Sequence, residues 1–306
     1  MDKPAGPVPP AGFLVLDKPA GVTSRAALNA VQRAARGAGW GRRVKVGHAG
    51  TLDPLATGVL VACVGKATKL IARVQALPKT YRATFRLHAS SPSLDTEIPP
   101  APVPDPPAVS RADVEAVLPR FLGTIEQVPP AFSAVKVDGK RAYDLARRGD
   151  EVELSAKPVA VHSLTVLTFA DDVLELEIEC GSGFYVRSLG RDLAAALGTD
   201  AVMTALERTR IGGFTLDDAV RPRDVTAESV PDLLTLNFSK LGLPVLSVSG
   251  EQAADLRGGR FAAVGAAPGE YGVLDAAGRP ACVGAVGGDG TLRPSTTFPV
   301  PTVSRA

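Results

Sequence analysis

A strict alternation of apolar and acidic side chains between residues 174 and 180 constrains the fold of this chain most. The apolar members are Leu174, Leu176, Ile178 and Cys180, and the acidic members are Glu175, Glu177 and Glu179. Because a period of two places successive side chains on opposite faces of a β-strand, this segment predicts a strand with one wet face. Residues 81–87 alternate similarly, and the apolar run 59–64 predicts a strand buried on both faces. The chain is therefore expected to contain a largely buried β-sheet.

Helix signals lie between these predicted strands. Thr23 or Ser24 can cap a helix that glycines at 37 and 39 end. The segment 110–113 resembles a capping box and predicts a helix to about residue 122, and a third helix follows the glycine turn at 181–183. The proline-rich stretch 91–108 predicts an irregular connection.

Length and composition restrict the class of protein. A chain of 306 residues with 45% apolar content can bury a substantial core, and its length suggests about two domains. The three cysteines and three histidines are scattered without a CxxC pair, which argues against a zinc site or a disulfide framework and favours a reducing compartment. Residues 1–11 are rich in Pro and Gly and are expected to form a disordered tail. Without a signal sequence or a membrane-length apolar run, we expect a cytoplasmic protein.

The N-terminal third carries a one-sided charge. Asp53 is the only acidic residue between Lys18 and Leu94. The basic residues of the same stretch are Lys18, Arg25, Arg33, Arg36, Arg42, Arg43, Lys45, Lys66, Lys69, Arg73, Lys79, Arg82 and Arg86. Such a field attracts a polyanion, whereas a carboxylate repels phosphate, so we expect Asp53 to have a chemical use. The alternative is an ordinary solvated surface.

The loop around Asp53 is the string GHAGTLDPLATG at 47–58. A proline after Asp53 disfavours helical geometry at the aspartate, and the glycines allow a ligand to approach the backbone closely. This pattern predicts a carboxylate presented from a stiff, exposed loop. The alternative is that Asp53 caps a short helix beginning at Pro54.

Four separated motifs, in order, resemble the TruB family of tRNA pseudouridine-55 synthases over most of residues 12–215. They are GFLVLDKPAGVTS at 12–24, GHAGTLDPLATGVL at 47–60, KTYRATFRL at 79–87 and CGSGFYVRSLGRDL at 180–193. The resemblance implies an α+β pseudouridine synthase fold, with a central mixed or antiparallel sheet flanked by helices. It also implies a catalytic domain over 12–240 with a thumb insertion at about 129–152, and a small β-rich, PUA-like RNA-binding domain over 245–306.

The resemblance implies three catalytic residues: Asp53 as the nucleophile, with Tyr81 and Arg187 in the active site. An aspartate with a pKa near 3.9 is an anion at neutral pH, and an adjacent arginine would keep it charged and oriented. A tyrosine offers uracil a flat face and supplies a hydroxyl that can move a proton. From the residues alone, Tyr81 could instead be a core aromatic, and Arg187 could meet solvent or Glu179.

Further residues are predicted to bind the substrate. They are His48, Tyr185, Leu206, Lys18, Lys136 and Arg141. His48 would contact the displaced nucleotide or its former partner, or simply make a backbone hydrogen bond, and Leu206 matches the family's pocket leucine. Lys18 matches the lysine of the first motif, where a structural role is expected. Lys136 and Arg141 would meet phosphate from the thumb, although nearby acids dilute the charge there.

The implied reaction converts uridine 55 in the T loop of tRNA to pseudouridine after the base is flipped out of its stack. The N1–C1′ bond breaks and C5 bonds to C1′ without any redox change, so no metal, nucleotide or redox cofactor is expected. Whether Asp53 adds to C6, attacks C1′ or assists glycal formation stays open. The expected partner is the T arm of tRNA, bound by a monomer.

Other enzyme classes fit the sequence less well. Most glycosidases use two carboxylates, whereas this segment supplies one. The glycine spacing before Lys66 does not match a P-loop. A non-catalytic tRNA-binding or tRNA-folding protein stays open, as does a guide-RNA-dependent relative, although the thumb and the short termini favour a stand-alone bacterial enzyme.

Overall fold

The computed structural model describes residues 9–42, 44–133, 135–137, 140–142, 148 and 154–302. The chain divides into two compact units. The first unit consists of Met1–Pro54, Gly58–Gln75 and Ile211–Ala306, and the second unit consists of Leu55–Thr57 and Ala76–Arg210. The sequence predicts a boundary between a catalytic domain and a PUA-like domain at residues 240–245. That boundary stays a prediction.

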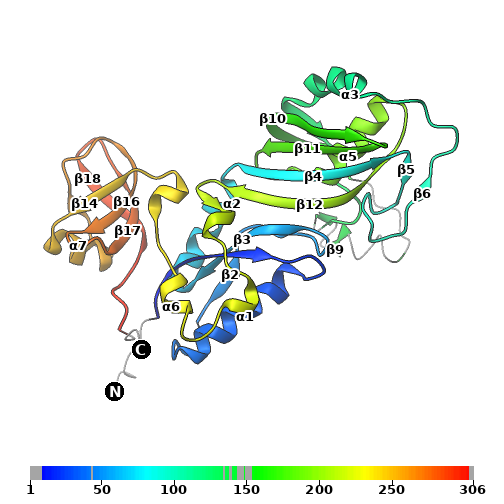
Figure 1. Ribbon diagram of the computed structural model, residues 1–306. Coiled ribbons are helices and arrows are strands. Elements are labelled where there is room, and N and C mark those ends of the chain that lie inside the picture. The colour runs from blue at the N-terminus through cyan, green and yellow to red at the C-terminus, as the bar shows by residue number, and fades with distance from the viewer. Residues whose placement is uncertain are drawn as a thin grey trace. The chain divides into compact units, whose positions relative to one another are not determined.

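The first unit is built on a pair of antiparallel strands, β1 (Gly12–Lys18) and β3 (Thr57–Val64). Their register runs from Gly12 opposite Val64 to Lys18 opposite Gly58, and β2 (Val46–His48) also pairs with β3. The helix α1 (Ser24–Gly37) contacts β1 and β2 through the buried face that its periodicity predicts (Figure 1). Its N-cap is Thr23, whose side chain accepts a hydrogen bond from the Ala26 amide. After β3 come η1 (Gly65–Leu70) and α2 (Ile71–Ala76).

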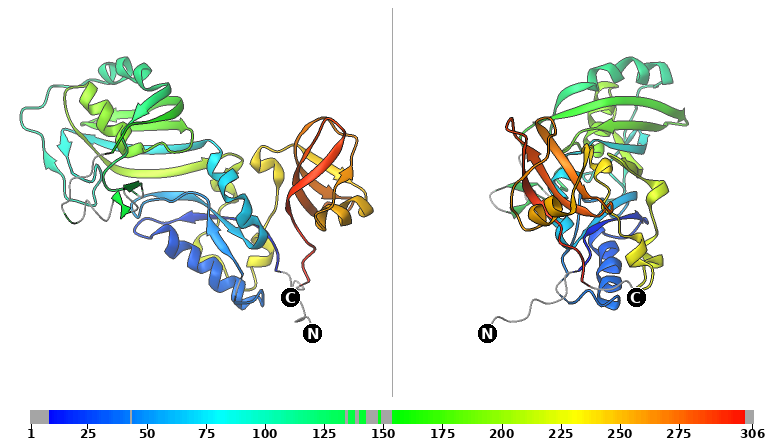
Figure 2. Two further views of the ribbon diagram at one scale, coloured as in Figure 1. Left: turned by 180° about the vertical axis from the view of Figure 1, so that it is seen from behind. Right: turned by 90° about the vertical axis from the view of Figure 1, so that its left-hand side faces the viewer.

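The C-terminal part of the first unit is a small β structure. Its five-stranded sheet has the order β14-β16-β17-β18-β15, and the strands curl around a compact core (Figure 2). The elements are β14 (Val245–Val248), α7 (Gly250–Arg257), β15 (Ala262–Ala263), β16 (Gly269–Asp275), β17 (Pro280–Val286) and β18 (Thr291–Thr297). Short elements lead to it, namely β13 (Phe214–Thr215), η3 (Leu216–Asp218), η4 (Pro222–Asp224), α6 (Val230–Leu233) and η5 (Phe238–Leu241). Residues 281–284 of β17 are buried in succession, so this central strand is covered on both faces there.

The second unit is a sheet of order β12-β4-β11-β10-β7. Its strands are β4 (Lys79–Leu87), β7 (Gly123–Gln127), β10 (Lys157–Ala170), β11 (Val173–Cys180) and β12 (Ala201–Ile211). Strand β11 pairs antiparallel with β4 and β10, and its leucines and isoleucine are buried as the alternation predicts. The helix α5 (Val186–Ala196) contacts β4, where Gly190 lies against the ring of Phe85 (Figure 1).

Smaller elements complete the second unit. They are β5 (Ala89–Ser90), β6 (Ala101–Pro102), α3 (Arg111–Val117), η2 (Leu118–Phe121), β8 (Lys136–Val137) and β9 (Lys140–Arg141). The capping box at Ser110 and Asp113 is present as predicted. The α-helix ends at Val117 rather than near 122, because Pro119 removes an amide donor and the chain tightens into η2. The stretch 91–108 is largely irregular, as expected, apart from β6, which pairs with β5.

Some predictions fall outside the described residues. They concern residues 1–8 of the tail, Arg43, and half of the thumb, of which 134, 138–139, 143–147 and 149–152 are not described. Residues 9–11 are half-buried and irregular. Among the helices of the described ranges, none is long and apolar enough to cross a membrane.

Candidate active site

The residue before Asp53 is held by a buried serine at the start of α1. The Ser24 hydroxyl accepts a hydrogen bond from the Leu52 amide at 2.8 Å and donates one to the Leu52 carbonyl at 2.9 Å. Both side chains are buried. A single side chain therefore satisfies both backbone groups of Leu52 in a place that water does not reach.

The residue after Asp53 is held from the loop between β1 and α1. The Pro54 carbonyl accepts hydrogen bonds from the Gly21 amide at 2.8 Å and from Lys18 Nζ at 3.3 Å. Lys18 is fully buried and also donates to the carbonyls of Pro19 at 3.0 Å and Val22 at 2.6 Å. This geometry favours the structural role of Lys18 over contact with a substrate.

The aspartate lies in a loop rather than at a helix end. Residues 51–56 contain no helix, so the alternative in which Asp53 caps a helix from Pro54 is wrong. The glycines at both ends of the loop have φ of 105° at Gly50 and 94° at Gly58, a region that L side chains rarely adopt. Asp53 is half-buried between its two fixed neighbours. The predicted loop is therefore present, although the aspartate is less exposed than expected.

His48 belongs to the same unit as Asp53. It ends β2, opposite Ala62 of β3, and its side chain is half-buried. The first unit thus contains three of the predicted site residues, Lys18, His48 and Asp53, all on segments joined to the β1–β3 pair.

The second unit contains Tyr81, Tyr185, Arg187 and Leu206. Tyr81 is buried in β4, opposite Ile178 of β11. Leu206 is buried in β12, and its carbonyl accepts a hydrogen bond from the Thr57 hydroxyl at 3.4 Å. A buried tyrosine fits a core role as well as a catalytic role, so burial alone does not decide between them.

Arg187 is bound into a network that the sequence did not predict. Its Nη1 donates to the Ser93 carbonyl at 3.0 Å, its Nη2 donates to the Phe132 carbonyl at 3.0 Å, and Nη1 lies 3.4 Å from Asp95 Oδ2. The Arg187 and Asp95 side chains are 7% and 5% exposed, which makes this a buried ion pair. The alternative in which Arg187 meets solvent is therefore wrong.

Asp95 lies in the loop 91–98, whose backbone is held by side-chain hydrogen bonds. Hydroxyl groups tie this loop together: Ser91 Oγ lies 3.1 Å from Ser93 Oγ, and Ser93 Oγ donates to the Asp95 carbonyl at 3.1 Å. Asp95 Oδ1 accepts from the Glu97 amide at 2.9 Å. The sequence shows only a carboxylate among serines in a proline-rich stretch. No sequence pattern predicts that this carboxylate pairs with Arg187, some ninety residues later.

Tyr185 is positioned by Gln127, another residue that sequence reasoning missed. The Gln127 side chain accepts from the Tyr185 amide at 2.8 Å and donates to the Tyr185 carbonyl at 3.2 Å. Gln127 is 2% exposed at the end of β7. Two bonds from one amide fix the backbone that leads into α5 and Arg187.

Two further cations of the second unit are buried. Lys79 shares a face of β4 with Tyr81, and Arg208 follows Leu206 by two residues along β12. Burial lowers the pKa of Lys79 to about 8, and the Arg208 charge adds to this effect. Lys79 belongs to the basic segment of the N-terminal third, but its burial removes it from the surface that a polyanion could reach.

The predicted phosphate contacts of the thumb are only partly described. Lys136 starts β8 and Arg141 ends β9, and these two residues are opposite each other in the antiparallel pair. Their side chains lie outside the described part of the chain. Their binding role stays a prediction.

The cysteines do not provide an alternative nucleophile. Cys63, Cys180 and Cys282 are free and buried, and burial raises the pKa of each thiol to about 12. Across the described residues, no group of three His, Cys, Asp or Glu side chains is arranged to hold a metal ion.

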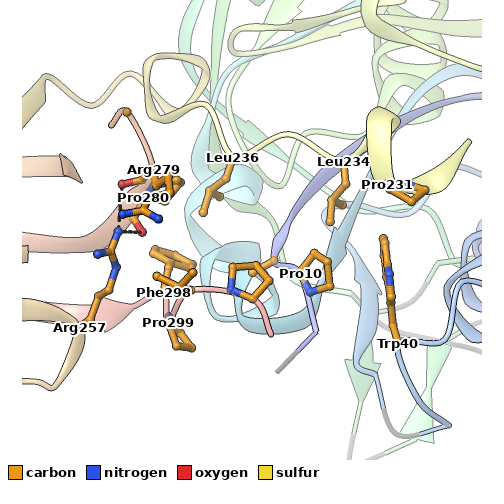
Figure 3. Close-up of a pocket in the computed structure, with 14 residues that line it drawn as sticks. Pro10, Trp40, Pro231, Leu234, Leu236, Arg257, Arg279, Pro280, Phe298 and Pro299 are labelled. Atoms are coloured by element: carbon orange, nitrogen blue, oxygen red, sulfur yellow. Dashed lines mark hydrogen bonds between the residues drawn. The ribbon is translucent and has the colours of Figure 1, made fainter. Parts of the chain in front are cut away.

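One cavity of the first unit lies away from the predicted site residues. It measures about 460 Å³ and is lined by Trp40 and Pro10 and by Phe298 and Pro299 near the C-terminus (Figure 3). Arg257 and Arg279 also line it, and both are bonded to the buried Asp275. It contains none of the predicted site residues, so its size carries no argument about catalysis.

Solved structures define the class of fold. One chain in the "Crystal Structure of a Cbf5-Nop10-Gar1 Complex" superposes with a TM-score of 0.67 at 22% identity, covering 96% of this chain and 85% of that chain. A chain in the "Structure of H/ACA RNP bound to a substrate RNA containing 2'-deoxyuridine" gives a TM-score of 0.68 at 20% identity, covering 96% and 87%. At this identity the likeness concerns the fold alone. It is the α+β pseudouridine synthase fold, with a mixed sheet, helices and a small curled β domain, as predicted.

Sequence comparison narrows the class to a family. Residues 40–186 match the model described as "TruB family pseudouridylate synthase (N terminal domain)". The chain is 46% identical over 200 residues to "tRNA pseudouridine synthase B" of Parabacteroides distasonis, covering 65% of this chain and 83% of that protein. It is 43% identical over 298 residues to the protein of the same name from Cereibacter sphaeroides, covering 94% and 96%. The chain belongs to the TruB family and is a pseudouridine synthase, an isomerase.

Proposed function

We propose that this enzyme converts uridine 55 in the T loop of tRNA to pseudouridine, with Asp53 as its nucleophile. The observation that carries the proposal is the loop in which Ser24, Lys18 and Gly21 hold the backbone on both sides of Asp53. A nucleophile that must meet one atom of a flipped base gains most of its rate advantage from a fixed position. The relatives named tRNA pseudouridine synthase B support tRNA as the substrate.

The chemistry needs a carboxylate and no oxidant. Uridine and pseudouridine are isomers: the N1–C1′ bond breaks, the C5–C1′ bond forms, and the proton on C5 is replaced by one on N1. Addition of Asp53 to C6, attack on C1′ and assistance to glycal formation all require Asp53 as an anion. We assign the charged, oriented state of the site to Arg187, which Asp95 and two backbone carbonyls hold in place.

The base must first leave its stack. Flipping costs a few kcal/mol, and aromatic stacking returns about 1 to 3 kcal/mol per base. We assign stacking and proton movement to Tyr81, with Tyr185 and Leu206 shaping the pocket and His48 meeting the displaced nucleotide or its former partner. Exposed cations of the basic segment would bind phosphate. An enzyme of tRNA works where tRNA is made, so we propose the cytoplasm as its location.

The experiment compares the wild type with Asp53→Asn, which preserves the shape of the side chain but removes its charge. Unmodified T-arm RNA is incubated with each protein, and pseudouridine is mapped chemically at single-nucleotide resolution. We expect modification at position 55 by the wild type alone, with tRNA binding by both proteins and matched thermal unfolding curves as the folding control. Equal rates for the two proteins would remove Asp53 from the mechanism. A wild type that binds tRNA without forming pseudouridine would instead favour a tRNA-binding or tRNA-folding protein.

A further inference from the structure

The hydroxyl of Ser133 is buried in the second unit without a hydrogen-bond partner. The residue is 5% exposed, and among the described residues of this unit its Oγ is the one buried side-chain polar atom that no hydrogen bond reaches. The other buried serines of the unit are Ser91, Ser93 and Ser188, and the hydroxyl of each is in a hydrogen bond. A buried hydroxyl without a partner destabilises the folded protein and is rare, so it points to a ligand that completes the bond.

Ser133 lies next to a carbonyl that holds Arg187. The Phe132 carbonyl, directly before Ser133 in the chain, accepts a hydrogen bond from Arg187 Nη2 at 3.0 Å. The Val128 carbonyl, five residues before Ser133, accepts a hydrogen bond from the Ser188 hydroxyl at 2.8 Å. Two bonds therefore attach this short segment to the start of α5. They keep Ser133 beside the guanidinium that we assign to the active site.

The chemistry of a serine hydroxyl suits a uracil carbonyl. Rotation about χ1 moves the hydroxyl between staggered positions, so a covered hydroxyl can turn toward a bound ligand and donate a hydrogen bond to it. Uracil presents two carbonyl oxygens, O2 and O4, on either side of N3. Because C5 must take the place of N1 at C1′, the base turns about the axis through N3 and C6, and this turn exchanges O2 with O4. A donor that meets one carbonyl before the turn therefore meets the other carbonyl after it.

We propose that Ser133 is a substrate-binding residue whose hydroxyl donates a hydrogen bond to a carbonyl oxygen of the target uracil. The proposal rests on the proposed function and adds a residue to it. The contact is available in both orientations of the base. Cytosine carries an amino group in place of O4, so it leaves the hydroxyl without an acceptor in one of the two orientations. A site with a buried polar group left unpaired discriminates strongly against such a ligand.

Stability provides the first test. The variant Ser133→Ala removes a hydroxyl that has no partner in the free enzyme, so we expect its Tm to stay within about 1 °C of the wild type or to rise. The matched control is Ser188→Ala, because the Ser188 hydroxyl is also buried but is bonded to the Val128 carbonyl. We expect this control to lower the Tm by about 2 to 4 °C.

Catalysis provides the second test. Turnover is measured on T-arm RNA with uridine, 2-thiouridine or 4-thiouridine at the target position, because sulfur accepts hydrogen bonds only weakly. On the uridine RNA, we expect Ser133→Ala to lower kcat/KM by about three- to tenfold, the value of one neutral hydrogen bond. At least one thio substitution should lower kcat/KM of the wild type by a similar factor. The same substitution should cost Ser133→Ala less than about twofold, because the donor is already gone.

Three outcomes overturn the proposal. One is a Ser133→Ala protein that melts as far below the wild type as Ser188→Ala does, because the hydroxyl would then have a partner inside the free enzyme. The others are a normal kcat/KM of Ser133→Ala on the uridine RNA, and equal losses for variant and wild type from both thio substitutions. Each of these removes the role of Ser133 alone while the wild type still forms pseudouridine. A wild type that forms no pseudouridine in the uridine RNA overturns the proposed function itself.

Discussion

The substitution Ser24→Ala tests whether the hold on the Asp53 loop matters for catalysis. The Ser24 hydroxyl makes both hydrogen bonds to the backbone of Leu52, at 2.8 and 2.9 Å, and both residues are buried. Alanine leaves a buried amide and a buried carbonyl without these bonds, and each unsatisfied group costs about 1 to 3 kcal/mol. Allowing for relaxation of the loop, we expect the free energy of unfolding to fall by about 2 to 4 kcal/mol.

The same change should lower the rate more than it lowers binding. Leu52 directly precedes Asp53, so relaxation of its backbone moves the nucleophile, and a displacement of about 1 Å can reduce the rate of a positioned reaction by about 100-fold. Neither atom of Leu52 bonded by Ser24 belongs to the RNA-binding surface we propose. We therefore expect kcat for pseudouridine formation to fall by one to two orders of magnitude, with KM for tRNA within about threefold of the wild type.

Thr23→Ala provides a matched control one residue away. Thr23 caps α1 by accepting a hydrogen bond from the Ala26 amide at 3.1 Å, and its loss costs about 1 kcal/mol without touching the Asp53 loop. Both variants are assayed below their unfolding transitions, which urea titration defines. If Ser24→Ala is destabilised as expected but turns over like Thr23→Ala, the loop does not depend on Ser24 for its catalytic position, and our reasoning is refuted.

Three further changes test the second unit and the small β structure. Asp95→Asn breaks a buried ion pair, so stability should fall by about 3 to 5 kcal/mol in urea titrations, and kcat should fall as Arg187 loses its orientation. Gln127→Ala should destabilise by about 2 kcal/mol and lower kcat, whereas a normal kcat would show that Tyr185 needs no such support. Hydrogen bonds from Arg257 are the main reason that the pKa of Asp275 lies well below its ordinary value. The charged Asp275 therefore contributes its full stabilisation of the fold above pH 4, and this contribution falls as the pH drops below 4. The stability gap between the wild type and Asp275→Asn should therefore be constant from pH 5 to 7 and narrow at pH 3, and a constant gap at pH 3 would contradict this.

Local patterns predicted the elements of the fold because they depend on neighbours in sequence. The alternation at 174–180 became β11, the apolar run at 59–64 lies within β3, and the Thr23 cap begins α1. The end of α3 was misjudged by a few residues, because apolar periodicity continues past the point where Pro119 stops the α-helix. Strand order was not predictable, since it depends on pairings such as β4 with β11 across some ninety residues.

Sequence motifs predicted some residues of the candidate site. Residues that matter through a tertiary contact could not be predicted from the sequence. Asp53, Tyr81 and Arg187 came from motifs, and their roles stay proposals. Asp95 and Gln127 came only from the structure, since a lone carboxylate in a loop and an amide at a strand end look ordinary in sequence. Charge counting overestimated the basic field, because Lys18 and Lys79 are buried and turn to the interior.

The arrangement around Asp53 answers a physical conflict in using a carboxylate as a nucleophile against RNA. A side chain that is bonded tightly enough to be immobile loses basicity and nucleophilicity, whereas an unrestrained one reaches the target atom rarely. The hydrogen bonds described above act on backbone atoms of Leu52 and Pro54, so they fix the Cα position of Asp53 through its two neighbours. Residues of the first motif thus hold the loop of the second motif. Ser24 bonds to the amide and the carbonyl of Leu52, and Lys18 and Gly21 bond to the carbonyl of Pro54.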